Sequence, residues 1–201
     1  MTAPRRPRRE VRADFDDQAL TVYQAYSPEI ADAALAAGTF IRPFKRDRMT
    51  WIKPSFLWMM YRSGWATKAG QERVLAVRIS RVGFESALAH SCLSHFDRAV
   101  YASHAEWLEC KNATPVRVQW DPERSLQLAP LDYRAIQVGL SGQAVHEYVD
   151  EWITGISDVT TLACEIRTLI LDGDRVEALN RLPVERSLPV PESIKAVIGA
   201  D

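Results

Sequence analysis

The chain has 201 residues, of which 47% are hydrophobic, and its formal net charge is −1 at pH 7. This length and composition predict one compact domain with a substantial core, and the near-zero net charge gives no overall bias toward nucleic acid. The longest apolar run is FLWMMY, whereas a membrane-spanning helix needs about 20 such residues. We therefore expect a cytoplasmic protein with no membrane partner.

The N-terminal segment, MTAPRRPRREVR, is rich in arginine and is interrupted by Pro4 and Pro7. No apolar stretch follows it, whereas a secretory signal requires one. Proline and closely spaced like charges discourage regular structure. We expect residues 1–12 to form a disordered basic arm and residues 13–201 to form a single α+β domain.

Strand and helix signals alternate in the first part of this domain. Residues 20–27 have the β-branched and aromatic content of a strand, and residues 28–38 have the apolar spacing of a helix that ends at a glycine. Residues 39–44 predict a second short strand, which a loop follows. Residues 55–65 predict a helix with a serine cap and a glycine terminator. Because its apolar side chains run nearly all round, we expect this helix to be buried.

The rest of the chain shows strand and helix signals without a regular alternation. The patterns predict strands over 73–80, 116–120 and 133–142 and a short helix over 81–91. The strand over 116–120 is expected to close in a turn at Asp121 and Pro122. Residues 143–173 predict one or two helices interrupted near Gly155, and the proline-containing tail is expected to be mostly extended.

The order of these elements bears on fold class and on the enzyme classes that the sequence excludes. The chain has neither a regular βα alternation nor a glycine-rich first turn, which favours an α+β fold with a mixed, mainly antiparallel sheet and flanking helices. The sequence contains no GxxxxGK[ST], GxGxxG or GxSxG motif. Enzymes that depend on those phosphate loops or nucleophile elbows are therefore excluded.

The spacing of the cysteines is not that of a metal site. Cys92, Cys110 and Cys164 are widely spaced and form no CxxC pair, so we expect reduced thiols and no metal ion. His90 and His95 bracket Cys92, and a Cys-His pair can in principle act as nucleophile and base. The spacing is not diagnostic, and a core thiol between two partly exposed histidines is the preferred interpretation.

The strongest chemical signal is a basic and aromatic segment in the first half of the chain. Five cations lie within twelve residues of each other, namely Arg42, Lys45, Arg46, Arg48 and Lys53. Trp51 lies among them and offers a flat face for a base or a nicotinamide ring. Alternatively, Trp51, Trp58 and Trp65, at a spacing of seven, would pack along one side of a helix. We expect residues 42–55 to face a ligand and residues 56–65 to form a core helix.

Three phrases carry a resemblance to known families. These are VYQAYSPEIADAALAAG, RMTWIKPSFLWMMYRSGW, and VQWDPER followed by YRAIQVGL. Together they resemble the family called domain of unknown function 4291. The first phrase also resembles, more distantly, the opening of the ADP-ribosyltransferase fold, in which a strand leads into a helix that ends at glycine.

The second resemblance implies a site for NAD. Gln24 stands where many members have His or Arg, so it and Tyr26 would contact the ribose and the nicotinamide. Gln137 stands at the position of the catalytic Glu, where an amide can only orient a nucleophile or the ribose, and Glu123 is an alternative acid. The residues expected to bind the cofactor are Gln24, Tyr26, Ser27, Arg46, Arg48, Trp51, Lys53 and Ser55.

Two functions follow from these patterns. The first is an ADP-ribosyltransferase-like enzyme that binds NAD or a related nucleotide and transfers ADP-ribose to a nucleic acid or a protein. The second is a non-catalytic nucleic-acid-binding module that uses the arginine arm and residues 42–53 on phosphates. A purely structural or partner-binding role also stays open.

Overall fold

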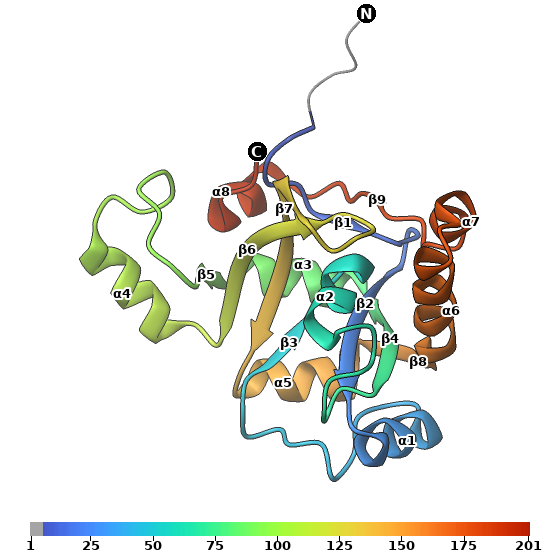
Figure 1. The fold of residues 1–201 in the computed structure, drawn as a ribbon. Coiled ribbons are helices and arrows are strands. Elements are labelled where there is room, and N and C mark those ends of the chain that lie inside the picture. Colours follow the sequence, from blue (N-terminus) through green and yellow to red (C-terminus); the bar gives the residue numbers. More distant parts are fainter. Residues whose placement is uncertain (1–5) are drawn as a thin grey trace, which may run out of the picture.

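The computed structural model describes residues 6–201, and this part of the protein forms two main β-sheets with helices around them (Figure 1). One sheet is antiparallel with the order β2-β4-β8, and the other has four strands in the order β3-β7-β6-β5. Within the described residues, β5 and β6 are the one parallel pair of these sheets. The predicted α+β class with a mixed, mainly antiparallel sheet is confirmed.

The elements follow one another irregularly along the chain. The strands are β1 (Arg12–Ala13), β2 (Ala19–Tyr26), β3 (Thr50–Ile52), β4 (Arg73–Ser80), β5 (Ser91–Leu93), β6 (Val116–Arg124), β7 (Pro130–Leu140), β8 (Ile153–Asp158) and β9 (Arg186–Ser187). The helices are α1 (Pro28–Ala37), α2 (Phe56–Ser63), α3 (Arg81–Ala89), α4 (His104–Ala113), α5 (Gln143–Glu147), a π-helical turn η1 (Tyr148–Trp152), α6 (Thr160–Leu171), α7 (Arg175–Asn180) and α8 (Glu192–Ile198).

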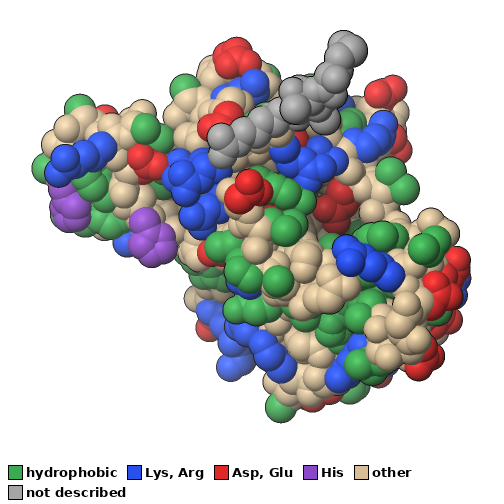
Figure 2. Space-filling model, turned by 45° about the horizontal axis from the view of Figure 1, so that its top comes forward, with side chains coloured by type: hydrophobic (Ala, Val, Ile, Leu, Met, Phe, Trp, Pro, Cys, Tyr) green, Lys and Arg blue, Asp and Glu red, His purple; other side chains and the backbone are tan. Residues whose placement is uncertain are grey.

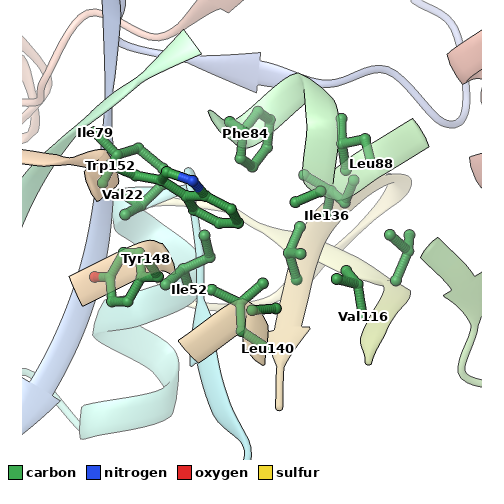
Figure 3. Packing of buried hydrophobic residues seen from close by; sticks show 14 of the residues in the cluster. Val22, Ile52, Ile79, Phe84, Leu88, Val116, Ile136, Leu140, Tyr148 and Trp152 are labelled. Atoms are coloured by element: carbon green, nitrogen blue, oxygen red, sulfur yellow. The ribbon is translucent and has the colours of Figure 1, made fainter. Parts of the chain in front are cut away.

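The main core lies between the two sheets (Figure 3). Val22 comes from the first sheet and Ile136 from the second, and Trp152 of η1 stands between them. A Cβ atom at Gly83 would lie 2.4 Å from the Trp152 ring, so only glycine allows α3 to approach the indole this closely. The sheets also meet directly, because Tyr23 and Lys53 form an antiparallel bridge between β2 and the end of β3.

Local signals set the ends of α1 and α2, and both predicted helices are confirmed. The Ser55 hydroxyl accepts a hydrogen bond from the Trp58 backbone N–H at 3.1 Å, which caps α2. Gly64 ends the helix in the left-handed conformation with φ 61°. Met59 and Trp58 are buried, as the core interpretation of this segment predicted.

The second short strand, expected over residues 39–44, is wrong. These residues form turns, and the Phe40 and Phe44 rings stack on each other with centroids 4.6 Å apart. Their apolar character therefore reflects packing from a turn rather than strand pairing. The strand lies later, at β3, where a loop was expected.

The predicted turn at Asp121 and Pro122 is also wrong, because β6 runs through both residues to Arg124. β5 pairs with β6 only from Val116 to Val118, so Pro122 lies on a stretch of β6 that has one strand neighbour among the described residues. Proline is tolerated at such an edge because no ladder partner needs its missing N–H.

The C-terminal part contains more regular structure than expected. The break predicted near Gly155 is a complete strand, β8, which pairs with β4 from Leu75 to Ile79. The tail is partly helical rather than mostly extended, because α7 and α8 form there and bury Ile194 and Ile198. Both elements depend on partners that lie far away in the sequence.

The N-terminal segment contacts the body from Arg6 onward, where the Arg6 guanidinium lies 4.4 Å from the centroid of the Tyr133 ring. Val11 is only 2% exposed, and Arg12 belongs to β1. The Arg9 guanidinium pairs with Asp97 at 2.7 Å, and its backbone N–H donates to the Asp201 carboxylate at 2.9 Å. The prediction of a disordered arm over residues 1–12 is therefore wrong for residues 6–12, and residues 1–5 lie outside the described part.

Charged side chains of both signs are interspersed over the surface shown in Figure 2. The segment that carries α4 projects from the body of the molecule (Figures 1 and 2). Among residues 6–201, no helix has the length and apolar character needed to cross a bilayer.

Candidate functional site

A cleft of about 640 Å³ opens where the two sheets meet, between β2, β3, β6, β7 and α2. Several of the residues that the sequence singled out line it together: Gln24, Tyr26, Arg48, Trp51, Lys53 and Gln137. They come from three segments that are distant in the sequence. The bridge between Tyr23 and Lys53 brings the first two segments together, and the pairing of β3 with β7 adds the third.

The other predicted site residues lie elsewhere. Arg46 forms an ion pair with Asp150 at 2.7 Å, outside the lining of the cleft. Ser27 precedes α1 and is half-buried. Ser55 and Glu123 line a separate cavity of about 180 Å³. The structure therefore brings Arg48, Trp51 and Lys53 together in the cleft and separates them from Ser55.

The floor of the cleft is a hydrogen-bond network around Gln24. Its Nε2 donates to Tyr26 Oη and to Thr50 Oγ1, both at 2.8 Å, and its Oε1 accepts from Tyr148 Oη at 2.6 Å. Burial raises the pKa of Tyr26 to about 12, so its phenol stays neutral. The Gln24 amide is thus occupied by the protein, and its main effect is to hold β2, β3 and η1 together beneath the ligand space.

Lys53 is the most unusual charged group of the cleft. Its side chain is 7% exposed, and Nζ donates to the Trp51 carbonyl at 3.0 Å and lies 5.5 Å from the centroid of the Trp58 ring. Burial and the nearby Arg62 lower the pKa of Lys53 to about 7. Within residues 6–201, no carboxylate forms an ion pair with it. Such an amine gains a proton and a partner when an anion binds beside it.

The Trp58 indole, which borders the same space, carries a donor without a partner within residues 6–201. Its Nε1 is buried and has no hydrogen-bond partner among the described residues, although Trp58 lines the cleft. A buried donor without a partner is energetically costly. Trp58 is therefore buried and also borders the cleft.

The charge of the cleft is strongly unbalanced. Four of its lining residues are cations, Lys45, Arg48, Lys53 and Arg62, whereas Asp121 is the one carboxylate in its described lining. Among the described residues, neither Arg48 nor Arg62 forms an ion pair. Unpaired guanidinium groups in a concave site suit a phosphate-bearing ligand.

Two glutamines hold Asp121. Gln119 Nε2 donates to Asp121 Oδ1 at 3.0 Å, and Gln137 Nε2 donates to Asp121 Oδ2. Gln119 and Gln137 are directly opposite each other in the β6–β7 ladder. Sequence reasoning missed Gln119 and Asp121, because a turn was expected at Asp121. The signal was available in VQWDPER, where the two residues alternate with Trp120 as they would on one face of a strand.

Trp51 owes its place to a glycine on the neighbouring strand. It pairs with Gly139, where a Cβ atom would lie 2.9 Å from Trp51 Cζ2. Such a contact is shorter than real Cβ atoms show, so the indole occupies the space that a side chain on β7 would need. The close approach of β7 thus sets where the aromatic wall of the cleft stands.

The smaller cavity has a different character. The Ser55 hydroxyl donates to Glu123 Oε1 at 2.8 Å, and the Phe56 backbone N–H donates to Glu185 Oε1 at 2.7 Å. Burial raises the pKa of Glu123, and burial together with the charge of Glu123 raises the pKa of Glu185 to about 8. These carboxyl groups satisfy donors at the start of α2, which is a structural role.

The family model described as "Domain of unknown function (DUF4291)" matches residues 10–188. The chain belongs to the DUF4291 family. The match spans every segment that lines the cleft, so the cleft is part of the family domain. Comparison with curated proteins and with solved structures gave no significant match. The family description names no activity, and the function of this DUF4291 protein must be argued from the cleft.

Proposed function

We propose that this DUF4291 protein is an ADP-ribosyltransferase-like enzyme that binds NAD or a related nucleotide in the cleft between its two sheets. The observation that carries the proposal is the convergence of Tyr26, Arg48, Trp51, Lys53 and Gln137 on one space of about 640 Å³. That volume is typical of a small-molecule site, whose usual range is about 300–1,000 Å³.

The chemistry of the lining matches the parts of a dinucleotide. Arg48, Lys53 and Arg62 supply positive charge for a pyrophosphate. The Trp51 ring offers a flat apolar surface for nicotinamide or adenine. The cleft lies between two mainly antiparallel sheets, so a bound dinucleotide would contact strands of both.

The reaction would break the bond between ribose C1′ and the nicotinamide nitrogen. The bonding electrons leave with nicotinamide, which becomes neutral, and positive charge develops at C1′. A nitrogen or oxygen of the acceptor then donates an electron pair to C1′ and loses its proton to solvent. The residues of the cleft would hold the two ends of NAD while this charge develops.

Isothermal titration of the protein with NAD, ADP-ribose and ATP tests the binding step. We expect 1:1 binding of at least one of these nucleotides, with weaker binding after Arg48→Ala. An absence of heat with all three at millimolar concentration contradicts the proposal. Release of nicotinamide tests the catalytic step, and Gln137→Ala should reduce it while leaving nucleotide binding measurable.

The alternative function, nucleic-acid binding, depends on arginines that already form ion pairs in the structure. Arg9 and Arg12 of the N-terminal segment are paired with Asp97 and Glu10, and Arg46 is paired with Asp150. Affinity for a single strand that rests on phosphate contacts must fall steeply with salt. Strong binding of a single-stranded oligonucleotide with such a salt response, and no binding of nucleotides, would favour the alternative.

A further inference from the structure

Asp121 stands apart from the other charged residues of the cleft. It is the one carboxylate in the described lining, which also contains four cations, and it lies on β6 next to the strand that carries Gln137. It is half-buried, and none of the ion pairs among residues 6–201 includes it. Asp121 is therefore a group able to bind positive charge in a cleft whose other charged residues suit an anion.

The hydrogen bonds of Asp121 leave its charge intact. Each carboxylate oxygen accepts one amide N–H, from Gln119 on one side and from Gln137 on the other. Each oxygen can accept more than one donor, so both retain capacity for a ligand. Neutral amides orient a carboxylate without cancelling its charge, whereas an arginine would neutralise it.

Gln137 is uncharged, but its hydrogen-bond partner Asp121 is a carboxylate. In the resemblance to the transferase fold, position 137 belongs to a carboxylate, and an amide there cannot stabilise positive charge. The Gln137 amide instead donates to Asp121, which brings a negative charge next to that position from the neighbouring strand.

We propose that Asp121, positioned by Gln119 and Gln137, is the group that stabilises positive charge on the ribose of a ligand in the cleft. This inference rests on the proposed function, because it assigns the carboxylate of that reaction. The cleft is then divided by charge: the cations face the phosphates, and Asp121 faces C1′, where positive charge develops as nicotinamide leaves. A fixed carboxylate in a partly dry site stabilises such charge more than water does.

Two ligands that differ in one charge test the inference without requiring turnover. The first is ADP-ribose, and the second is ADP linked to a protonated pyrrolidine diol in place of the terminal ribose. Isothermal titration of the wild-type protein should show the cationic ligand binding about tenfold more tightly, which corresponds to one additional favourable charge contact. Asp121→Asn, which keeps the shape of the side chain, should reduce this preference to about onefold.

Asp132→Asn is the matched control, because Asp132 is an exposed carboxylate on β7 outside the cleft. It should keep the wild-type preference. The inference is overturned if wild-type protein binds both ligands equally, or if Asp121→Asn retains the preference. Equal loss of both ligands in Asp121→Asn also overturns it, since that result indicates a structural role. Failure of the wild-type protein to bind either ligand is a different outcome and counts against the proposed function itself.

Discussion

Lys53 and Ser55 are two residues apart in the chain, yet they belong to opposite kinds of polar site. Lys53 lies in the cleft with one hydrogen bond to a carbonyl and a lowered pKa. Ser55 uses its hydroxyl both to accept from the Trp58 N–H and to donate to Glu123. The comparison shows that two buried polar residues can differ in how completely their hydrogen-bonding capacity is used. A buried polar group whose hydrogen bonds are complete stabilises the fold, whereas unused capacity is the observation on which the proposed ligand role of Lys53 rests.

The largest expected effect concerns Lys53. Lys53→Met should lower the affinity for a nucleotide about 30-fold or more, because a charge contact in a buried site is lost while the phosphate stays in place. Thermal unfolding should show no loss of stability, since the buried amine has no carboxylate partner among residues 6–201. Lys111→Met is the control, because Lys111 lies on α4 beside Trp107 and outside the cleft. Unchanged affinity in Lys53→Met would remove Lys53 from the ligand site.

The two sites should also respond to pH in opposite directions. The pKa of Glu185 is raised from 4.5 to about 8, so the stability it provides is present at low pH and is lost as the pH rises toward 8. The pKa of Lys53 is lowered from 10.5 to about 7, so stability increases as the pH rises from 7 toward 10.5. The two effects oppose each other between pH 7 and 8.

Melting temperatures measured across pH 5–10 check this opposition. Glu185→Gln keeps an acceptor for the Phe56 N–H and should abolish the fall in melting temperature as the pH rises toward 8. Lys53→Met should abolish the increase in melting temperature as the pH rises above 7. We expect differences of several degrees, because each kcal/mol changes the melting temperature of a chain of this size by about 2–4 °C. Glu192→Gln, at a largely exposed site on α8, should follow the wild-type profile. Parallel profiles for Glu185→Gln and the wild type would contradict the assignment.

A smaller effect separates capping from ligand binding. Ser55→Ala should lower the free energy of unfolding by about 1–2 kcal/mol, because α2 loses its cap and Glu123 loses a donor. Ser103→Ala removes a comparable cap from α4 without affecting a buried carboxylate, so its cost should be smaller. Urea unfolding measures both variants. The nucleotide affinity of Ser55→Ala should equal that of the wild type. A large loss of affinity would indicate that Ser55 contacts the ligand.

The smallest effect is expected for Arg46, which the sequence grouped with the ligand residues. Arg46→Ala breaks an exposed ion pair with Asp150 and should leave both stability and nucleotide affinity almost unchanged. Arg48→Ala, its neighbour in the cleft, should instead weaken nucleotide binding several-fold while leaving stability unchanged. Equal effects of the two substitutions on affinity would mean that the cleft does not distinguish these arginines.

Where sequence reasoning failed, the missing information was a contact with a distant part of the chain. β8 pairs with β4, which lies more than seventy residues earlier, and its six residues carry a weak apolar pattern of their own. Asp121 was expected to end a strand because Asp-Pro usually marks a turn. The pairing with β7 extends β6 past it and brings Asp121 beside Gln137.

The sequence by itself determined the features that depend on a few neighbouring residues. These are the capped and terminated helices α1 and α2, the alternating strands β4 and β7, and the position of the basic and aromatic segment. Only the tertiary structure decided which polar side chains share a cleft, because the Tyr23–Lys53 bridge and the β3–β7–β6 register join segments that no local pattern relates. Strand register is selected by the burial of whole faces, and that burial exists only once the two sheets have packed.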